Sequence, residues 1–173
     1  MLTLRGLLKE AERMGELQEV VQPIDWDEEM GALNYMVAQR EGAPVLWFKN
    51  VRDAGYGSTA VMNLFGTGKD RVALSMGLPK GLSMLELVEA AKNSFSRKVP
   101  PRLVPAEQAP VNEVILEGEE IDLRKFPAPR MWPRDGGRYL GTWDVLVTRD
   151  REDGHLNLGT YRQMIKGPRE LFV

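Results

Sequence analysis

The sequence of 173 residues contains no cysteine and a single histidine. The absence of cysteine excludes disulfides, thiolate metal sites and a cysteine nucleophile, and it agrees with a reducing cytoplasm. No apolar stretch reaches the roughly 20 residues of a membrane span, and no signal-peptide pattern is present. The formal net charge of −2 is unlike the basic balance of a nucleic-acid binder. We therefore expect a soluble, cytoplasmic protein without a nucleic-acid or membrane partner.

Helical periodicity marks the first part of the chain. Leu4, Leu7, Leu8 and Ala11 fall on one helical face, and Gly15 stands where a helix should stop. Three further helices are predicted. The first follows an acidic capping box at Asp25 and Glu28 and continues until Gly42, and the second spans residues 70–76. The third begins at the capping box of Ser83 and Glu86 and has one apolar face (Met84, Leu87, Val88, Ala91 and Phe95). Apolar runs at residues 17–21, 44–48 and 59–62 predict strands, so residues 1–98 should form a small α/β domain.

The second part of the chain has the pattern of β-strands. A proline-rich stretch predicts an extended linker over residues 99–111 (Pro100, Pro101, Pro105 and Pro110). Strands are predicted at residues 113–116, 139–148, 155–166 and 171–173. The Asp153-Gly154 pair predicts a hairpin turn, because glycine accepts the positive φ that such turns require. Residues 112–173 should therefore contain the few strands of an incomplete sheet with open edges.

Three features offer chemistry, and each has a plainer interpretation. His155 is a candidate ligand or base, but a solvated turn histidine is the favoured interpretation. The two glycines of residues 63–68 precede a predicted helix as in a phosphate site, yet a tight turn is favoured because the P-loop lysine and the full GxGxxG spacing are missing. An acidic run could bind a cation, but solvated charges are favoured (Glu113, Glu117, Glu119, Glu120 and Asp122).

The segment from Asn157 to Arg162 has more specific chemistry. Asparagine offers a neutral oxygen for a hard cation, and arginine offers a planar fork that matches carboxylate or phosphate. The two residues have opposite parity, so a regular strand would send their side chains to opposite faces. A bulge at Gly159 could bring them to one site. An ordinary hairpin strand with exposed polar residues is the alternative.

The motifs of residues 126–162 resemble those of the UbiD-like decarboxylases. They run Phe-Pro-x-Pro from residue 126, Trp-Pro from 132, Asp-Gly-Gly-x-Tyr from 135, Thr142, Val-Thr-Arg-Asp from 147, and Asn-x-Gly-x-Tyr-Arg from 157. Upstream, Leu-Arg-x-Leu-Leu from residue 4, Gly-Glu-Leu from 15, the run 44–48 and Asn-Leu-Phe-Gly from 63 match in order and spacing. The resemblance implies an N-terminal α/β domain followed by the first strands of a split β-barrel that binds prenylated FMN.

The resemblance also implies a reaction and roles for particular residues. The family reversibly decarboxylates unsaturated or aromatic acids, with the modified flavin as electron sink. Asn157 matches a ligand of a flavin-bound divalent metal, usually Mn²⁺, with K⁺ as a possible further ion. Thr160, Tyr161 and Arg162 match positions that line the cofactor, and Arg162 matches the catalytic arginine beside the reacting carboxylate. Thr160 departs from the aliphatic residue that is frequent in the family.

Other family residues have no counterpart in this sequence. The second and third metal ligands, a histidine and a glutamate, and the catalytic acidic residues are expected further along than Val173. After Asn157 there is no histidine, and Glu170 is the only acidic residue. We expect the N-terminal part of a decarboxylase that is inactive alone and is completed by a partner chain or a homo-oligomer. The alternative is a non-catalytic α/β module that binds a partner chain or a flavin-like ligand. The end at residues 171–173, inside a predicted strand, favours the first interpretation.

Overall fold

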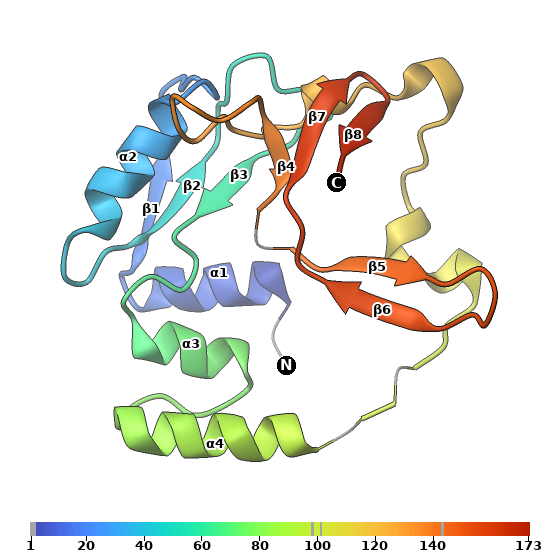
Figure 1. Cartoon of the computed structure of the whole chain (residues 1–173). Helices are drawn as coiled ribbons and strands as arrows, with labels where there is room; N and C mark the ends of the chain where they lie inside the picture. Colours follow the sequence, from blue (N-terminus) through green and yellow to red (C-terminus); the bar gives the residue numbers. More distant parts are fainter. Residues whose placement is uncertain (1–2, 98, 101, 143) are drawn as a thin grey trace.

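The N-terminal half of the chain is a three-stranded sheet between two helices. The computed structural model describes residues 3–97, 99–100, 102–142 and 144–173 (Figure 1). Strand β2 (Val45–Phe48) is central, with β1 (Leu17–Val20) parallel on one side and β3 (Ala60–Met62) antiparallel on the other. Helices α1 (Leu4–Arg13) and α2 (Glu29–Ala38) pack on opposite faces of this sheet. These elements confirm the predicted α/β character of the first half.

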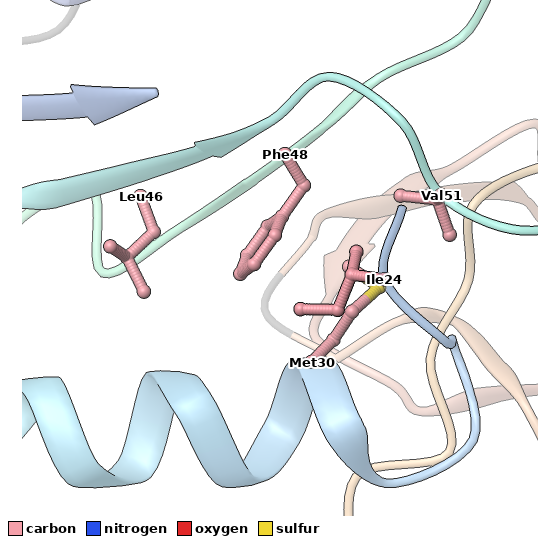
Figure 2. Packing of buried hydrophobic residues seen from close by; sticks show 5 residues of the cluster. All are labelled: Ile24, Met30, Leu46, Phe48 and Val51. Atoms are coloured by element: carbon pink, nitrogen blue, oxygen red, sulfur yellow. The ribbon is translucent and has the colours of Figure 1, made fainter. Parts of the chain in front are cut away.

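The side chains of β2 alternate between the two helices. One face contributes the core that α2 covers, shown in Figure 2 (Ile24, Met30, Leu46, Phe48 and Val51). On the other face Val45 packs with Leu8 and Ala11 of α1. Successive side chains of a strand point to opposite faces, so a strand covered on both sides must be apolar throughout. This is why residues 44–48 form an uninterrupted apolar run.

Helix α2 begins differently from the prediction. Glu28 directly precedes the helix with a φ of 65°, and its side chain makes no capping hydrogen bond with the described residues. Instead, the carboxylate of Glu29 accepts a hydrogen bond from the backbone N–H of Asp25 at 2.7 Å, and Asp25 accepts one from the N–H of Asp27 at 2.9 Å. The predicted capping box of Asp25 and Glu28 is therefore wrong, because the carboxylates of Asp25 and Glu29 close a turn before the helix.

A buried arginine organises the turn that leads into helix α3 (Lys69–Ser75). The guanidinium of Arg71 donates hydrogen bonds to the carbonyls of Phe65 and Ala43, at 3.2 and 2.7 Å, and forms an ion pair with Glu16 at 3.3 Å. Burial lowers the pKa of Arg71, and the charge of Glu16 opposes this shift. Gly66 and Gly68 lie directly against the guanidinium. Residues 63–68 therefore wrap around a protein side chain. This supports the interpretation of the segment as a tight turn and not as a phosphate site.

Helix α4 (Met84–Ser96) confirms its predicted start but not the burial of its apolar face. The hydroxyl of Ser83 accepts from the N–H of Glu86, and the carboxylate of Glu86 accepts from the N–H of Ser83, as in a capping box. Leu87 is buried, whereas Val88 and Phe95 are 57% and 82% exposed. Within the described part of the chain, no helix has the length and apolarity that crossing a membrane requires.

The connection between the two halves is a series of short 3-10 turns. They span Ala106–Gln108, Pro110–Asn112, Gly118–Glu120 and Leu123–Lys125. The linker predicted at residues 99–111 is thus only partly extended, because its last part forms 3-10 turns. The strand predicted at residues 113–116 is wrong. Residues 113–115 are exposed, residues 113 and 114 form a bend, and no described strand lies beside the segment to supply hydrogen bonds.

The C-terminal half contains two small antiparallel sheets. One has the order β4-β7-β8, formed by Tyr139–Gly141, Gln163–Gly167 and Glu170–Phe172. The other is a hairpin of β5 (Leu146–Arg149) and β6 (Leu156–Gly159), which projects away from the first sheet (Figure 1). The predicted strands 139–148 and 155–166 are each two strands that belong to different sheets. Across the described residues these sheets do not close into a barrel.

The hairpin turn forms where the sequence predicts it. Gly154 has a φ of 73°, in the left-handed region that favours glycine. The carboxylate of Asp150 accepts hydrogen bonds from the N–H groups of Glu152 and Asp153, and Asp153 accepts one from the N–H of His155. Short acidic side chains therefore satisfy the backbone donors of the loop, as is common in turns.

Ion pairs and backbone bonds join the two halves at the start of α2. Arg130 pairs with Asp27 at 2.5 Å and with Glu28 at 2.6 Å. The N–H of Glu28 donates to the carbonyl of Arg130, whose own N–H donates to the carbonyl of Trp26. The guanidinium of Arg138 stacks on the Trp26 ring, with Cζ 4.3 Å from the ring centroid. The loop before β4 is thereby held against the N-terminal domain.

We predict that Gly31→Ala destabilises the protein, although alanine favours helices. A Cβ at residue 31 would lie 2.6 Å from the carbonyl oxygen of Met131, so the junction must shift. We expect a loss of about 1–3 kcal/mol in the free energy of unfolding from overpacking, against a gain of about 1 kcal/mol from helix propensity alone. Urea denaturation measures the sign of the change in the free energy of unfolding. Ala32→Gly, at the exposed neighbouring position, reports the propensity effect, and stabilisation by Gly31→Ala would contradict this junction.

We also predict that the start of α4 loosens at acidic pH. Hydrogen bonding to the side chain of Ser83, and then to its backbone N–H, lowers the pKa of Glu86 from its ordinary 4.5. A carboxyl with a lowered folded pKa stabilises the fold above its ordinary pKa, and this stabilisation is lost as the pH falls through the lowered value. The protection factors of the amides in the first turn of α4, which correct for the intrinsic pH dependence of exchange, should fall below pH 4.5. The Ser83→Ala variant should have low protection factors at every pH; the same pH-dependent fall in this variant would oppose this account.

Candidate functional site

The most organised polar site in the C-terminal half surrounds Arg162. This residue lies in the connection between β6 and β7, directly before Gln163. Its guanidinium stacks on the ring of Tyr139 in β4, with Cζ 3.6 Å from the ring centroid. One of its amino groups lies 3.1 Å from an oxygen of Asp135, an ion pair in which the Arg162 side chain is 44% exposed and that of Asp135 only 10%. Arg162 is thus oriented from two sides and open to solvent on the rest.

The loop of Asp135 is itself well held. The backbone N–H of Trp132 donates to the second carboxylate oxygen of Asp135 at 3.2 Å, and the N–H of Asp135 donates to the carbonyl of Trp132 at 3.0 Å. The Trp132 ring meets the Tyr35 ring of α2 edge to face, with centroids 5.6 Å apart. The N–H of Tyr139 donates to the carbonyl of Pro129. This rigid loop therefore connects Arg162 to the N-terminal domain.

Asn157 occupies a different environment. It lies in β6 opposite Thr148, it is exposed, and no hydrogen bond joins its side chain to the described residues. The pairing of β5 with β6 is regular up to the Leu146–Gly159 pair, so the bulge that could have brought the two side chains together does not form. The strand predicted to contain both Asn157 and Arg162 ends at Gly159, and Arg162 lies in the connection that follows.

The remaining predicted cofactor-lining residues lie in the same connection. Thr160 and Tyr161 are both exposed. The ring of Tyr161 lies directly over Gly159, so that a Cβ at residue 159 would overlap it. Glycine therefore permits the close approach of the aromatic ring, which a Cβ at residue 159 would displace. Residues 160–162 thus form an exposed connection between β6 and β7, in which Tyr161 lies over Gly159 and Arg162 contacts Tyr139 and Asp135.

The described residues do not form a metal centre by themselves. They include no group of three histidine, cysteine, aspartate or glutamate residues that could hold a metal ion. Asn157 supplies one neutral oxygen, and hard divalent cations take six or more oxygen ligands including carboxylates. His155 is exposed beside the hairpin turn, in agreement with the solvated interpretation. The donors of this chain thus do not fit a complete metal site.

The acidic run also lacks the arrangement of a cation site. Asp122 pairs with Arg124 through both carboxylate oxygens, at 2.9 and 3.0 Å, and Glu119 pairs with Arg169 at 2.5 Å. Hydrogen bonding to Arg124 lowers the pKa of Asp122. Two of these carboxylates therefore neutralise arginines. Glu113, Glu117 and Glu120 are exposed, which agrees with the favoured interpretation of solvated charges.

Sequence reasoning missed several polar groups around the site. Asp135 belongs to the Asp-Gly-Gly-x-Tyr motif, and nothing in that pattern indicates an ion pair with a residue 27 positions later. Gln163 is buried and donates to Asp144 at 2.7 Å, while the other oxygen of Asp144 is buried without a partner among the described residues. Asp144 lines a cavity of about 560 Å³ between the turn after β3 and β4. A burial prediction for β4 and β7 would have been needed to find this pair.

Two sequence models of one carboxy-lyase family match the two halves of the chain. The 3-octaprenyl-4-hydroxybenzoate carboxy-lyase N-terminal domain matches residues 8–91. The 3-octaprenyl-4-hydroxybenzoate carboxy-lyase Rift-related domain matches residues 102–173. The chain therefore belongs to the UbiD family.

Solved structures of UbiD-class decarboxylases have the same fold. The open form of the vanillic acid decarboxylase of Sedimentibacter hydroxybenzoicus is 28% identical, with a TM-score of 0.81 over 95% of this chain. An evolved dimeric form of HmfF from Pelotomaculum thermopropionicum, in complex with prFMN, is 32% identical, with a TM-score of 0.80 over 98% of this chain. The apo 3,4-dihydroxybenzoic acid decarboxylase of Klebsiella pneumoniae is 20% identical with a TM-score of 0.83 over the whole chain, a likeness of fold alone.

The chain corresponds to only part of these enzymes. It covers 34% of the Sedimentibacter chain and 37% of the HmfF and Klebsiella chains. The mixed α/β fold and the membership in a family of decarboxylases are therefore established for the portion in hand. Activity, substrate and assembly belong to the larger enzymes.

We predict that Gly159→Ala displaces the ring of Tyr161. The Cβ would occupy the space of the ring, while the φ of residue 159 imposes no strain of its own. In the wild type, the aromatic ring should shift the NMR signals of the Gly159 Hα protons, and in the variant the contact between residues 159 and 161 should vanish. Gly154→Ala is the matched control in the same hairpin. It should strain the turn and leave Tyr161 in place; loss of the ring contact in both variants would show that the whole hairpin had unfolded.

Proposed function

We propose that this chain is the N-terminal part of a UbiD-like enzyme that reversibly removes CO₂ from an unsaturated or aromatic carboxylic acid with prenylated FMN. The observation that carries the proposal is Arg162, oriented on Tyr139 and Asp135 with part of its guanidinium open to solvent. The family membership and the decarboxylases of the same fold support it. The complexes of HmfF with prFMN and with FMN support a flavin.

Arg162 has the chemistry that the proposed reaction needs. Its planar group carries a permanent charge and five N–H donors in a fork that matches a carboxylate. Asp135 engages one amino group, and the ring of Tyr139 covers one face, so other donors can meet a second anion. We propose that Arg162 holds the substrate carboxylate and stabilises the charge that moves toward the flavin during decarboxylation.

Thr160, Tyr161 and Asn157 are proposed to contact the cofactor. Thr160 and Tyr161 lie beside Arg162 in the exposed connection between β6 and β7, where a ligand bound on the same surface can contact them. Asn157 is proposed as one ligand of a flavin-bound Mn²⁺, with the other ligands, and any K⁺ site, supplied by polypeptide outside the described residues. The flavin supplies the electron sink when it is bound. The residues of this chain bind and orient the reactants.

Exposed apolar surface supports the need for additional polypeptide. Val147 and Leu158 are a cross-strand pair of the β5–β6 hairpin, and they are 60% and 68% exposed. A two-stranded hairpin is marginally stable in water unless another layer covers its apolar face. We propose that further strands, from the remainder of the enzyme or from a partner chain, complete a split β-barrel around this hairpin.

Variants of the enzyme that contains this chain together with the remaining two-thirds test the proposal. We expect Asn157→Ala to lower the bound manganese at least tenfold, because a ligand is lost. Arg162→Ala should retain the flavin and lower kcat/KM at least a hundredfold, about 2.7 kcal/mol of transition-state binding. Arg151→Ala, an exposed arginine of the hairpin loop, is the control. Metal analysis, flavin absorbance and CO₂ release from a panel of aromatic and unsaturated acids are the measurements.

Two results would count against the proposed function. One is an intact enzyme that releases CO₂ from none of the acids when it is loaded with prenylated FMN. The other is equal activity of the Arg162 and Arg151 variants. The isolated chain should show no turnover with the same cofactor, because it provides one metal ligand of the set, and decarboxylation by the isolated chain would refute that part.

A further inference from the structure

Asp135 is a carboxylate anchored on both of its oxygens. One oxygen accepts from the backbone N–H of Trp132 at 3.2 Å, and the other accepts from Arg162 at 3.1 Å. The side chain is 10% exposed, so it has little contact with water. The turn that contains it is closed by a second bond between the same two residues, from the N–H of Asp135 to the carbonyl of Trp132. A carboxylate held in this way has a fixed position to which a mobile cation can be tied.

Arg162 needs such a tie because its side chain is long and half exposed. A free arginine side chain loses up to about 2 kcal/mol of rotamer entropy when it is fixed. Stacking on Tyr139 defines the plane of the guanidinium but leaves it free to turn within that plane. The bond to Asp135 removes this rotation. Together the two contacts define the direction in which the unused N–H donors point.

The geometry of the ion pair distinguishes a positioning role from competition with a ligand. Asp135 contacts Arg162 through a single amino nitrogen, and its second oxygen is used by Trp132. A carboxylate that occupied the whole fork would form two parallel bonds, as Asp122 does with Arg124. The arrangement at Asp135 therefore leaves one edge of the Arg162 guanidinium, with its N–H donors, available for another anion.

We propose that Asp135 is the positioning residue for Arg162, which it holds on Tyr139 so that the free edge of the guanidinium meets a substrate carboxylate. This assignment rests on the proposed function for the identity of the anion. Asp135 itself contacts neither substrate nor cofactor. It acts by reducing the freedom that Arg162 would otherwise lose when the carboxylate binds.

The test follows the side-chain Nε–H of Arg162 by ¹⁵N NMR in the full chain. Asp135→Asn keeps the shape and the bond from Trp132 but removes the charge. We expect the heteronuclear NOE of Arg162 Nε to fall to the level of a free surface arginine, and its exchange with water to accelerate at least threefold. Asp135→Glu should restore part of the order. Asp122→Asn, which breaks the comparable pair with Arg124, is the matched control and should leave Arg162 unchanged.

A titration with benzoate, the simplest aromatic carboxylate, tests the consequence for binding. We expect Arg162 Nε–H to shift in the wild type and the benzoate affinity to fall about fivefold to tenfold in Asp135→Asn, up to about 1.4 kcal/mol. Equal order of Arg162 in wild type and Asp135→Asn overturns the proposal. Tighter binding of benzoate by Asp135→Asn also overturns it, because Asp135 would then be a competitor. If no variant responds to benzoate but Asp135→Asn frees Arg162, the positioning stands and the carboxylate role proposed for Arg162 fails.

Discussion

The ion pairs of Arg130 with Asp27 and Glu28 hold the loop that precedes β4 on the N-terminal domain. Hydrogen bonding to Asp27, with the charges of Asp27 and Glu28, raises the pKa of Arg130, so the ion pairs favour the charged state that an arginine already has at physiological pH. Backbone bonds of Trp26 and Glu28 with Arg130 accompany the ion pairs. Because the same loop continues into the turn of Asp135, the position of the candidate site depends on this junction.

The sequence predicted those elements whose stability is local. The capping box of Ser83 and Glu86, the apolar run of β2 and the Gly154 turn all formed, because each depends on neighbouring residues or on burial from both sides. Predictions failed where the structure of a segment depends on a partner that is distant in the sequence. Residues 113–116 have strand composition but no strand beside them, and the apolar stripe of α4 has Leu87 alone buried. Hydrophobic periodicity reports a capacity for burial and does not specify what lies opposite.

The candidate site shows the same division. The residue types and spacing from Asn157 to Arg162 indicated a site, and the family resemblance is confirmed. The prediction that both residues lie in one strand, with or without a bulge at Gly159, is wrong. The chain leaves β6 at Gly159 and enters β7 at Gln163, so Arg162 belongs to a connection. Asp135 and Tyr139 appeared in the sequence as part of the Asp-Gly-Gly-x-Tyr motif, without any indication that they contact Arg162. Their contacts with Arg162 arise from tertiary packing between β4 and the start of β7, which no local pattern encodes.

The two proposed functional residues therefore differ in what orders them. Arg162 is held by Tyr139 and Asp135, and through the loop of Asp135 by the N-terminal domain, so its position is defined by residues within this chain. Asn157 belongs to a hairpin whose strands, among the described residues, pair only with each other and whose apolar face is exposed. Any metal ligation by Asn157 needs further donors and a covering layer, whereas anion contact by Arg162 needs neither. The proposed carboxylate-binding part of the site, around Arg162, can therefore be ordered within this chain alone. The proposed metal-binding part, around Asn157, becomes ordered only when the further donors and the covering layer are present.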